Sequence, residues 1–100
     1  MVMLYVTCKD SKEAGRISRN LLQKRIIACA NIFPIKSMFK WKGKIVSEKE
    51  YVVIAKTTNN NFKKAQGEIK KLHSYKIPCI LKINADANSE YLSWMKKEVG

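Results

Sequence analysis

Long apolar runs are missing from this 100-residue chain, although 46% of its residues are hydrophobic. Lysines interrupt every apolar segment well before the roughly 20 residues that a bilayer span needs. The apolar start of the chain is only as long as a strand, and it has neither a basic flank nor a cleavage site of small residues. We therefore expect a soluble protein with no signal peptide and no membrane contact.

Recognisable catalytic and nucleotide-binding motifs are also absent. The chain has a single histidine, and no serine and aspartate accompany it in a relay arrangement, which argues against catalysis of the Ser-His-Asp type. Neither of the glycine-rich phosphate-binding patterns occurs, and glycine contributes only four residues. We expect a binding protein rather than an enzyme.

The chain has few cysteines, and their number is odd. Three cysteines without a secretory signal are more typical of reduced thiols in the cytosol than of a disulfide framework. At least one of them must stay unpaired within a monomer. The cysteine count therefore predicts a cytoplasmic protein.

Acidic residues are scarce as well, because 8 Asp and Glu stand against 20 Lys and Arg and give a net charge of +12. A charge of this size attracts phosphate, anionic polymers and acidic surfaces. Lysine supplies 17 of the 20 basic residues, which an AT-rich coding sequence would also produce. The charge indicates possible small anions as ligands without identifying one.

What the chain does contain is a regular succession of strand and helix patterns. The predicted elements are strand 2–8, helix 11–25, strand 26–41, a strand around 51–55, helix 62–73, strand 78–83 and a final helix from 89. Asp10 and Glu13 form a capping box before the first helix, and Asn59–Asn61 can cap the second. Pro34 is expected to break or bulge the second strand.

The order βαββαβ followed by a helix is the split βαβ pattern. It predicts an α+β, ferredoxin-like fold: a four-stranded antiparallel sheet with two helices on one face, an extended hairpin between the second and third strands, and a C-terminal helix. No linker or repeat divides the chain, so we expect a single domain over residues 1–100. In this topology the first and fourth strands lie side by side and run in opposite directions.

Three residues with soft or borderline donors are predicted to meet at one end of this sheet. Cys8 ends the first strand, His73 ends the second helix and Cys79 opens the fourth strand. Thiolate and imidazole are ligands that copper and zinc prefer. Cys8, His73 and Cys79 therefore form a candidate site for a copper or zinc ion, with a fourth position open to water or another ligand.

Each of these residues also has a purely structural interpretation. Cys8 could pack as a small apolar residue, and His73 could bond the last carbonyls of its helix. Cys79 could form a disulfide with Cys8 or simply pack. Cys29 lies inside an apolar strand and is expected to be a core residue.

The hairpin carries more apolar surface than one chain can cover. Residues 34–42 extend it by nine positions, about 30 Å of strand. The side chains that need a partner there are Ile35, Met38, Phe39 and Trp41. An exposed edge of this kind aggregates unless another chain pairs with it, so we expect a closed homo-oligomer built by strand addition. The alternative is that the final helix folds back over the hairpin.

Six short strings, in order along the whole chain, resemble those of the CutA family of divalent-cation tolerance proteins. They are Val6-Thr7-Cys8 with Asp10, Ile27-Ala28-Cys29-Ala30-Asn31-Ile32, Trp41-Lys42-Gly43-Lys44-Ile45, Lys56-Thr57-Thr58, His73-Ser74-Tyr75-Lys76-Ile77-Pro78 and Tyr91-Leu92-Ser93-Trp94. The resemblance implies a homotrimer joined through its long hairpins and a role in tolerance of copper and other divalent cations.

The resemblance also implies a metal site. The positions tied to copper in the family correspond here to Cys8, His73 and the residue after Pro78. That last position usually holds glutamate, whereas this chain has Cys79. A second thiolate is a soft ligand and would make the site favour Cu(I) or Zn(II).

Two other functions compete with metal binding. Family trimers resemble the PII signalling proteins, whose architecture offers clefts between subunits for a small anion. RNA-recognition modules share the βαββαβ order, but the third strand here, 47–54, lacks the aromatic residues that stack bases. We therefore do not expect nucleic acid to be a partner of this protein.

Overall fold

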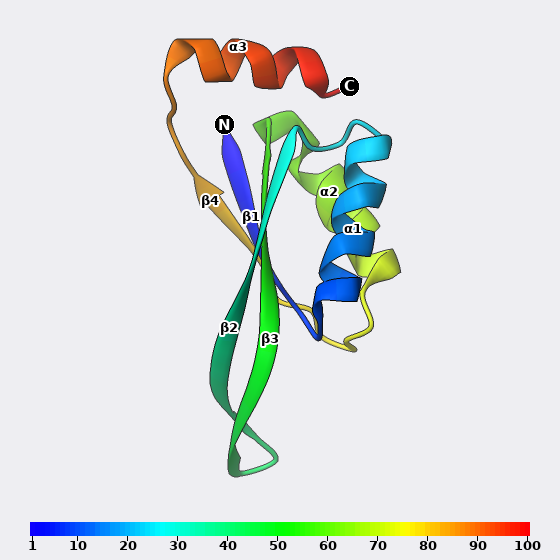
Figure 1. Cartoon of the computed structure of the whole chain (residues 1–100), viewed down its shortest axis with the longest axis vertical. Helices are drawn as coiled ribbons and strands as arrows, with labels where there is room; N and C mark the ends of the chain where they lie inside the picture. Colours follow the sequence, from blue (N-terminus) through cyan, green and yellow to red (C-terminus); the bar gives the residue numbers. More distant parts are fainter.

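The computed structural model describes residues 1–100 and contains four strands and three α-helices (Figure 1). In chain order they are β1 (Val2–Cys8), α1 (Ser11–Gln23), β2 (Cys29–Trp41), β3 (Lys44–Thr57), α2 (Phe62–Leu72), β4 (Ile80–Asn84) and α3 (Ser89–Glu98), with a 3₁₀ turn (Asn59–Asn61) before α2. The α+β class and the element order are those predicted. None of the helices has the length and apolar character needed to cross a lipid bilayer.

The four strands form one antiparallel sheet in the order β2-β3-β1-β4. The pairing of β1 with β4 confirms that the first and fourth strands are antiparallel neighbours. Helices α1 and α2 lie together on one side of this sheet (Figure 1). Burial along β1 alternates, with every second residue from Val2 to Cys8 fully enclosed and the residues between them only half-buried. Within one chain, therefore, only the helix-facing side of the central strand is closed.

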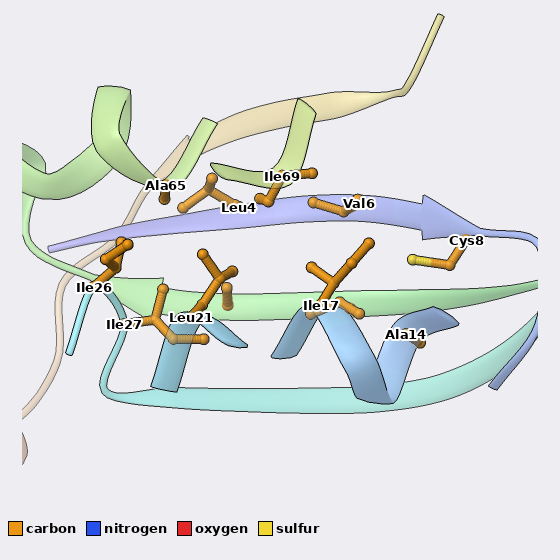
Figure 2. Close-up of a cluster of buried hydrophobic side chains, with 12 residues drawn as sticks. Leu4, Val6, Cys8, Ala14, Ile17, Leu21, Ile26, Ile27, Ala65 and Ile69 are labelled. Carbon is orange, nitrogen blue, oxygen red and sulfur yellow. The ribbon is translucent and has the colours of Figure 1, made fainter. Parts of the chain in front are cut away.

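The core lies between the sheet and these two helices (Figure 2). Leu4 and Val6 of β1 pack against Ile17 of α1 and Ile69 of α2, and none of these four side chains is exposed. Burial of one such side chain contributes roughly 1.5–3 kcal/mol. The core therefore fixes the ends of β1, α1 and α2 relative to one another, and this positions the cluster described below.

The β2–β3 hairpin is longer and more regular than its sequence suggested. Pairing runs residue for residue from Cys29 opposite Lys56 to Trp41 opposite Lys44. The expected break or bulge at Pro34 is wrong, because β2 is an edge strand, where a residue without an N–H can face away from its partner. The loop is Lys42-Gly43, with positive φ at both positions (50° and 78°). Positive φ at both residues characterises the type I′ turn, whose twist suits a two-residue hairpin.

Helix α3 lies at the end of the sheet opposite the hairpin tip (Figure 1). Arg25 fixes it there, because its guanidinium donates to the carbonyls of Lys97 and Glu98 at 2.9 and 3.0 Å. The alternative in which the final helix covers the hairpin is therefore wrong. Met38 and Trp41 keep 69% and 55% of their surface exposed in the single chain, so the hairpin still lacks a partner.

The predicted cap of the second helix is also wrong. Asn61 precedes α2 in a helical conformation and makes no side-chain bond to the helix. Its amide instead donates to the Ile26 carbonyl at 3.0 Å and to that of Gly100 at 3.3 Å. Asn61 is buried, so it ties the α1–β2 connection to the end of the chain rather than capping a helix.

Candidate functional site: the Cys8–Glu13–His73 cluster

Two of the three predicted ligands meet, together with a residue that the sequence had not suggested. Cys8 is the last residue of β1, Glu13 lies in the first turn of α1 and His73 follows α2 directly. The Cys8 sulfur, a Glu13 carboxylate oxygen and a His73 ring nitrogen lie within 4.8 Å of one another. The antiparallel sheet and its two helices bring these three ends of elements to one edge of the core.

Cys79 is not part of this cluster. It is exposed and precedes β4, where Ile80 pairs with Val6 and packs against the helix-facing core. Because side chains alternate between faces along an extended chain, the residue before Ile80 is directed away from Cys8. All three cysteines are free, so the disulfide considered for Cys8 and Cys79 is not formed. Cys29, expected in the core, is only half-buried.

Glu13 is the centre of the cluster. Its side chain is 1% exposed and accepts the backbone N–H of Lys9 at 3.0 Å and that of Ser74 at 2.9 Å, one at each carboxylate oxygen. Burial by itself would raise the pKa of Glu13, but the bonds from Ser74 and Lys9 outweigh it and hold the pKa below its usual value. Glu13 is therefore a buried carboxylate that joins the start of α1 to the segment after α2.

Part of this role was predictable from the residues at the start of α1. Asp10 caps α1 by accepting the Glu13 N–H at 2.8 Å, as the capping box predicted. In a capping box the glutamate returns to the N–H of the cap residue, whereas here it takes the N–H of Lys9. Its second oxygen is thereby directed to Ser74, which lies 61 positions away in sequence.

His73 uses both of its ring nitrogens within the protein. Nε2 lies 2.7 Å from the Thr7 carbonyl oxygen, and a carbonyl can only accept, so Nε2 carries the proton. Nδ1 accepts the N–H of Tyr75 at 3.1 Å. These two bonds assign the neutral tautomer with hydrogen on Nε2, and they leave no lone pair free for a metal ion.

Cys8 is held as a thiol. Burial, assisted by the negative charge of Glu13, raises the pKa of Cys8 to about 12. Figure 2 shows its sulfur enclosed with the core side chains of β1 and α1. At neutral pH the group is protonated and sheltered, so it is neither a ready nucleophile nor a ready ligand.

Tyr75 extends the network to β3. Its hydroxyl donates to Glu50 Oε2 at 2.6 Å, and its ring lies 4.7 Å from that of His73. Burial and the neighbouring Glu50 carboxylate raise the pKa of Tyr75 above its ordinary value. Residues 73–75 are therefore bound to β1, α1 and β3 at the same time, which anchors the start of the α2–β4 connection.

A metal ion can use this donor set only in exchange for the bonds that its atoms already make. Both carboxylate oxygens of Glu13 and both nitrogens of His73 already hold hydrogen-bond partners, and Cys8 retains its proton. An ion would have to displace these bonds and a thiol proton at once. As it stands, the cluster joins three elements through hydrogen bonds that are all satisfied.

The fold defines a ferredoxin-like protein of the PII-like class. The solved structure of the PII-like protein CutA from Nostoc sp. PCC 7120 superposes on it with a TM-score of 0.93 at 28% identity, covering 100% of this chain and 98% of that one. The family description CutA1 divalent ion tolerance protein matches residues 2–98. This chain belongs to that family.

Two archaeal relatives show how close the similarity is. The divalent-cation tolerance protein CutA of Archaeoglobus fulgidus is 42% identical over 97 residues, which cover 96% of this chain and 95% of that protein. Its solved structure is described as a periplasmic divalent cation tolerance protein and superposes with a TM-score of 0.97. A variant of CutA1 from Pyrococcus horikoshii superposes with a TM-score of 0.98 at 36% identity, covering 100% and 99% of the two chains.

Proposed function

We propose that this protein acts in divalent-cation tolerance as a homotrimer that binds a soft cation such as copper or zinc in an exchangeable way. The observation that carries the proposal is the meeting of Cys8, Glu13 and His73 within 4.8 Å in a chain of the divalent ion tolerance family. Thiol, imidazole and carboxylate together are a ligand set suited to zinc and copper.

Exchangeable binding follows from how the cluster is occupied. A cation competes with the thiol proton of Cys8 and with the bonds to Glu13 and His73, so the apparent affinity falls as the pH falls. Cys79 supplies the accessible soft donor, since it is exposed on the same α2–β4 connection as His73. We propose Cys79 as the residue that a cation contacts first.

Replacing both Cys8 and Cys79 by serine is expected to weaken binding of Cu(I) or Zn²⁺ by at least roughly 10- to 100-fold, because the two soft donors are lost. Anaerobic isothermal titration calorimetry at neutral pH measures the change. The matched control is Cys29→Ser, which removes a thiol outside the cluster and should leave the affinity unchanged. Unaltered metal uptake by the double variant would refute the proposal.

The role proposed is binding rather than catalysis. Cys8 is the only side chain of the cluster that could act as a nucleophile, and its pKa of about 12 keeps it protonated. His73 cannot serve as its base, because both ring nitrogens are engaged by backbone groups.

We also propose that the chain works in the cytosol. All three of its cysteines are free thiols, which favours a reducing compartment. The Archaeoglobus relative, in contrast, is described as periplasmic.

A second candidate function is recognition of a small anion, as the description of the Nostoc relative as PII-like suggests. A depression of about 470 Å³ lies beside the α2–β4 connection. Lys70, Lys76, Gln66 and Tyr75 supply its polar lining, and no acidic residue lines it. The calorimetry repeated with inorganic phosphate separates the two functions, because an anion bound there does not need Cys8 or Cys79.

A further inference from the structure

The positive charge of the chain is concentrated on one side of the molecule. Segments 9–25 and 62–76, which contain α1 and α2, hold 11 of the 20 basic residues and 3 of the 8 acidic ones. They therefore hold +8 of the net +12 in about a third of the chain. Both helices cover the same face of the sheet (Figure 1), so this charge forms one surface, here called the helix layer.

The three acidic residues of the helix layer are already engaged. Glu13 is buried and bound to backbone N–H groups, and Asp10 caps α1. Glu68 forms ion pairs with Lys24 at 3.0 Å and Lys71 at 3.5 Å. Most of the positive charge is thus uncompensated within the protein. The exposed cations without an ion-pair partner include Lys12, Arg19, Lys63, Lys64 and Lys70.

The spacing of these cations suits a regular polyanion. Along α1, Lys12 and Arg19 lie seven residues apart, about 10 Å of helix axis, and Arg16 between them is already engaged by Glu13 and the Leu72 carbonyl. A second row of lysines lies on α2, and packed helices are typically about 8–10 Å apart. A DNA duplex carries one negative charge about every 3.4 Å along each of its two strands. The two helices thus present cations at intervals of the same order as the phosphates of a duplex.

The composition of the surface distinguishes between possible partners. Leu22, 41% exposed, is the only large apolar side chain that either helix exposes strongly. A protein partner would need an apolar centre, and a peripheral membrane protein generally adds apolar anchors to its basic residues. Phosphate neutralisation needs neither, because its free energy comes from release of counterions. Lysine suits this role as a point charge that contacts phosphate without identifying bases.

We propose that the helix layer of α1 and α2 binds the phosphate backbone of double-stranded DNA without sequence preference. This goes beyond cation tolerance, and it differs from the RNA-recognition mode considered for the sheet, since that mode uses aromatic residues of the opposite face. Codon bias can explain the number of lysines, but it does not explain why 11 of the 20 cations and only 3 of the 8 acidic residues lie in these two segments.

The test uses the full chain and two labelled duplexes of about 20 base pairs with unrelated sequences, followed by fluorescence anisotropy in increasing KCl. The combined variant Lys12→Gln, Arg19→Gln and Lys63→Gln removes three helix-layer charges. We expect at least about a tenfold loss of affinity near 0.1 M salt, and a decrease of roughly two to three in the slope of log K against log salt. Both duplexes should respond equally.

The matched control removes three exposed charges from other surfaces, with Lys40→Gln, Lys96→Gln and Lys97→Gln combined. It has the same net charge and should keep the affinity within about threefold of wild type, since the phosphate contacts remain. Urea unfolding of both variants verifies that the fold is retained. Equal losses in the two variants would overturn the proposal, as would tighter binding to phosphatidylserine vesicles than to DNA at the same salt concentration.

Discussion

Replacing Glu13 by alanine is expected to destabilise the folded chain by about 2–4 kcal/mol, because two backbone N–H groups lose their acceptor at a part-buried site. The N–H groups of Lys9 and Ser74 would lose their acceptor, and each unsatisfied donor costs about 1–3 kcal/mol. The segment after α2 would also lose its link to α1. Urea unfolding followed by circular dichroism measures the change.

Two further substitutions distinguish the loss of the buried hydrogen bonds from the loss of a negative charge. Glu13→Gln keeps one acceptor oxygen but presents an amide to the other N–H, so it should cost less than Glu13→Ala. Glu90 also lies in a first helical turn, but it is exposed, and its carboxylate accepts from the exposed side chains of Asn88 and Ser89. Glu90→Ala should change the stability by at most about 0.5 kcal/mol. Similar effects of Glu13→Ala and Glu90→Ala would contradict a structural role for the cluster.

The same carboxylate predicts how stability depends on pH. Glu13 has a lower pKa in the folded chain than its ordinary value of 4.5, so the folded state binds this proton less readily than the unfolded state. The stabilisation is fully present above pH 4.5 and is lost as the pH falls through the lower, folded-state pKa. Denaturant midpoints measured from pH 7 down to pH 3 should therefore fall less steeply for Glu13→Gln than for wild type. Parallel curves would show that Glu13 does not titrate differently on folding.

The sequence predicted the fold because local signals and overall order agreed. Alternating strand and helix patterns gave the split βαβ topology, and this topology alone brought Cys8 near His73. The predicted break or bulge at Pro34 was wrong because the effect of a proline depends on whether its strand lies at the edge of the sheet. Strand order is a property of the whole sheet and cannot be seen in the local sequence.

The site was less predictable than the fold for two physical reasons. A shift of one residue in strand register moves a side chain to the opposite face, and the pairing of Ile80 with Val6 decides that Cys79 is directed away from Cys8. Glu13 had a complete local explanation as a capping residue. Its bond to Ser74 joins positions 61 residues apart, and no pattern within either segment indicates it.

The proposed trimer gives the other large expected effect. Replacing Phe39 and Trp41 together by glutamate should convert a particle of three 11.5 kDa chains into one of a single chain. Both side chains belong to the edge strand β2 and, two positions apart, lie on one face of the hairpin. Two buried carboxylates without partners would destabilise the interface by far more than burial of this face stabilises it. Size-exclusion chromatography with light scattering measures the mass directly.

The single substitution Lys40→Glu is the matched control, because it also lowers the charge by two but lies on the other face of the same strand. It should leave the trimer intact if the face that carries Phe39 and Trp41 is the one covered by a neighbouring chain. Since both aromatic residues are exposed in the single chain, at 38% and 55%, the double variant should keep its helical and strand content while its melting temperature becomes that of a monomer. A wild-type mass of one or two chains, or a double variant that still measures three, would exclude assembly through this hairpin.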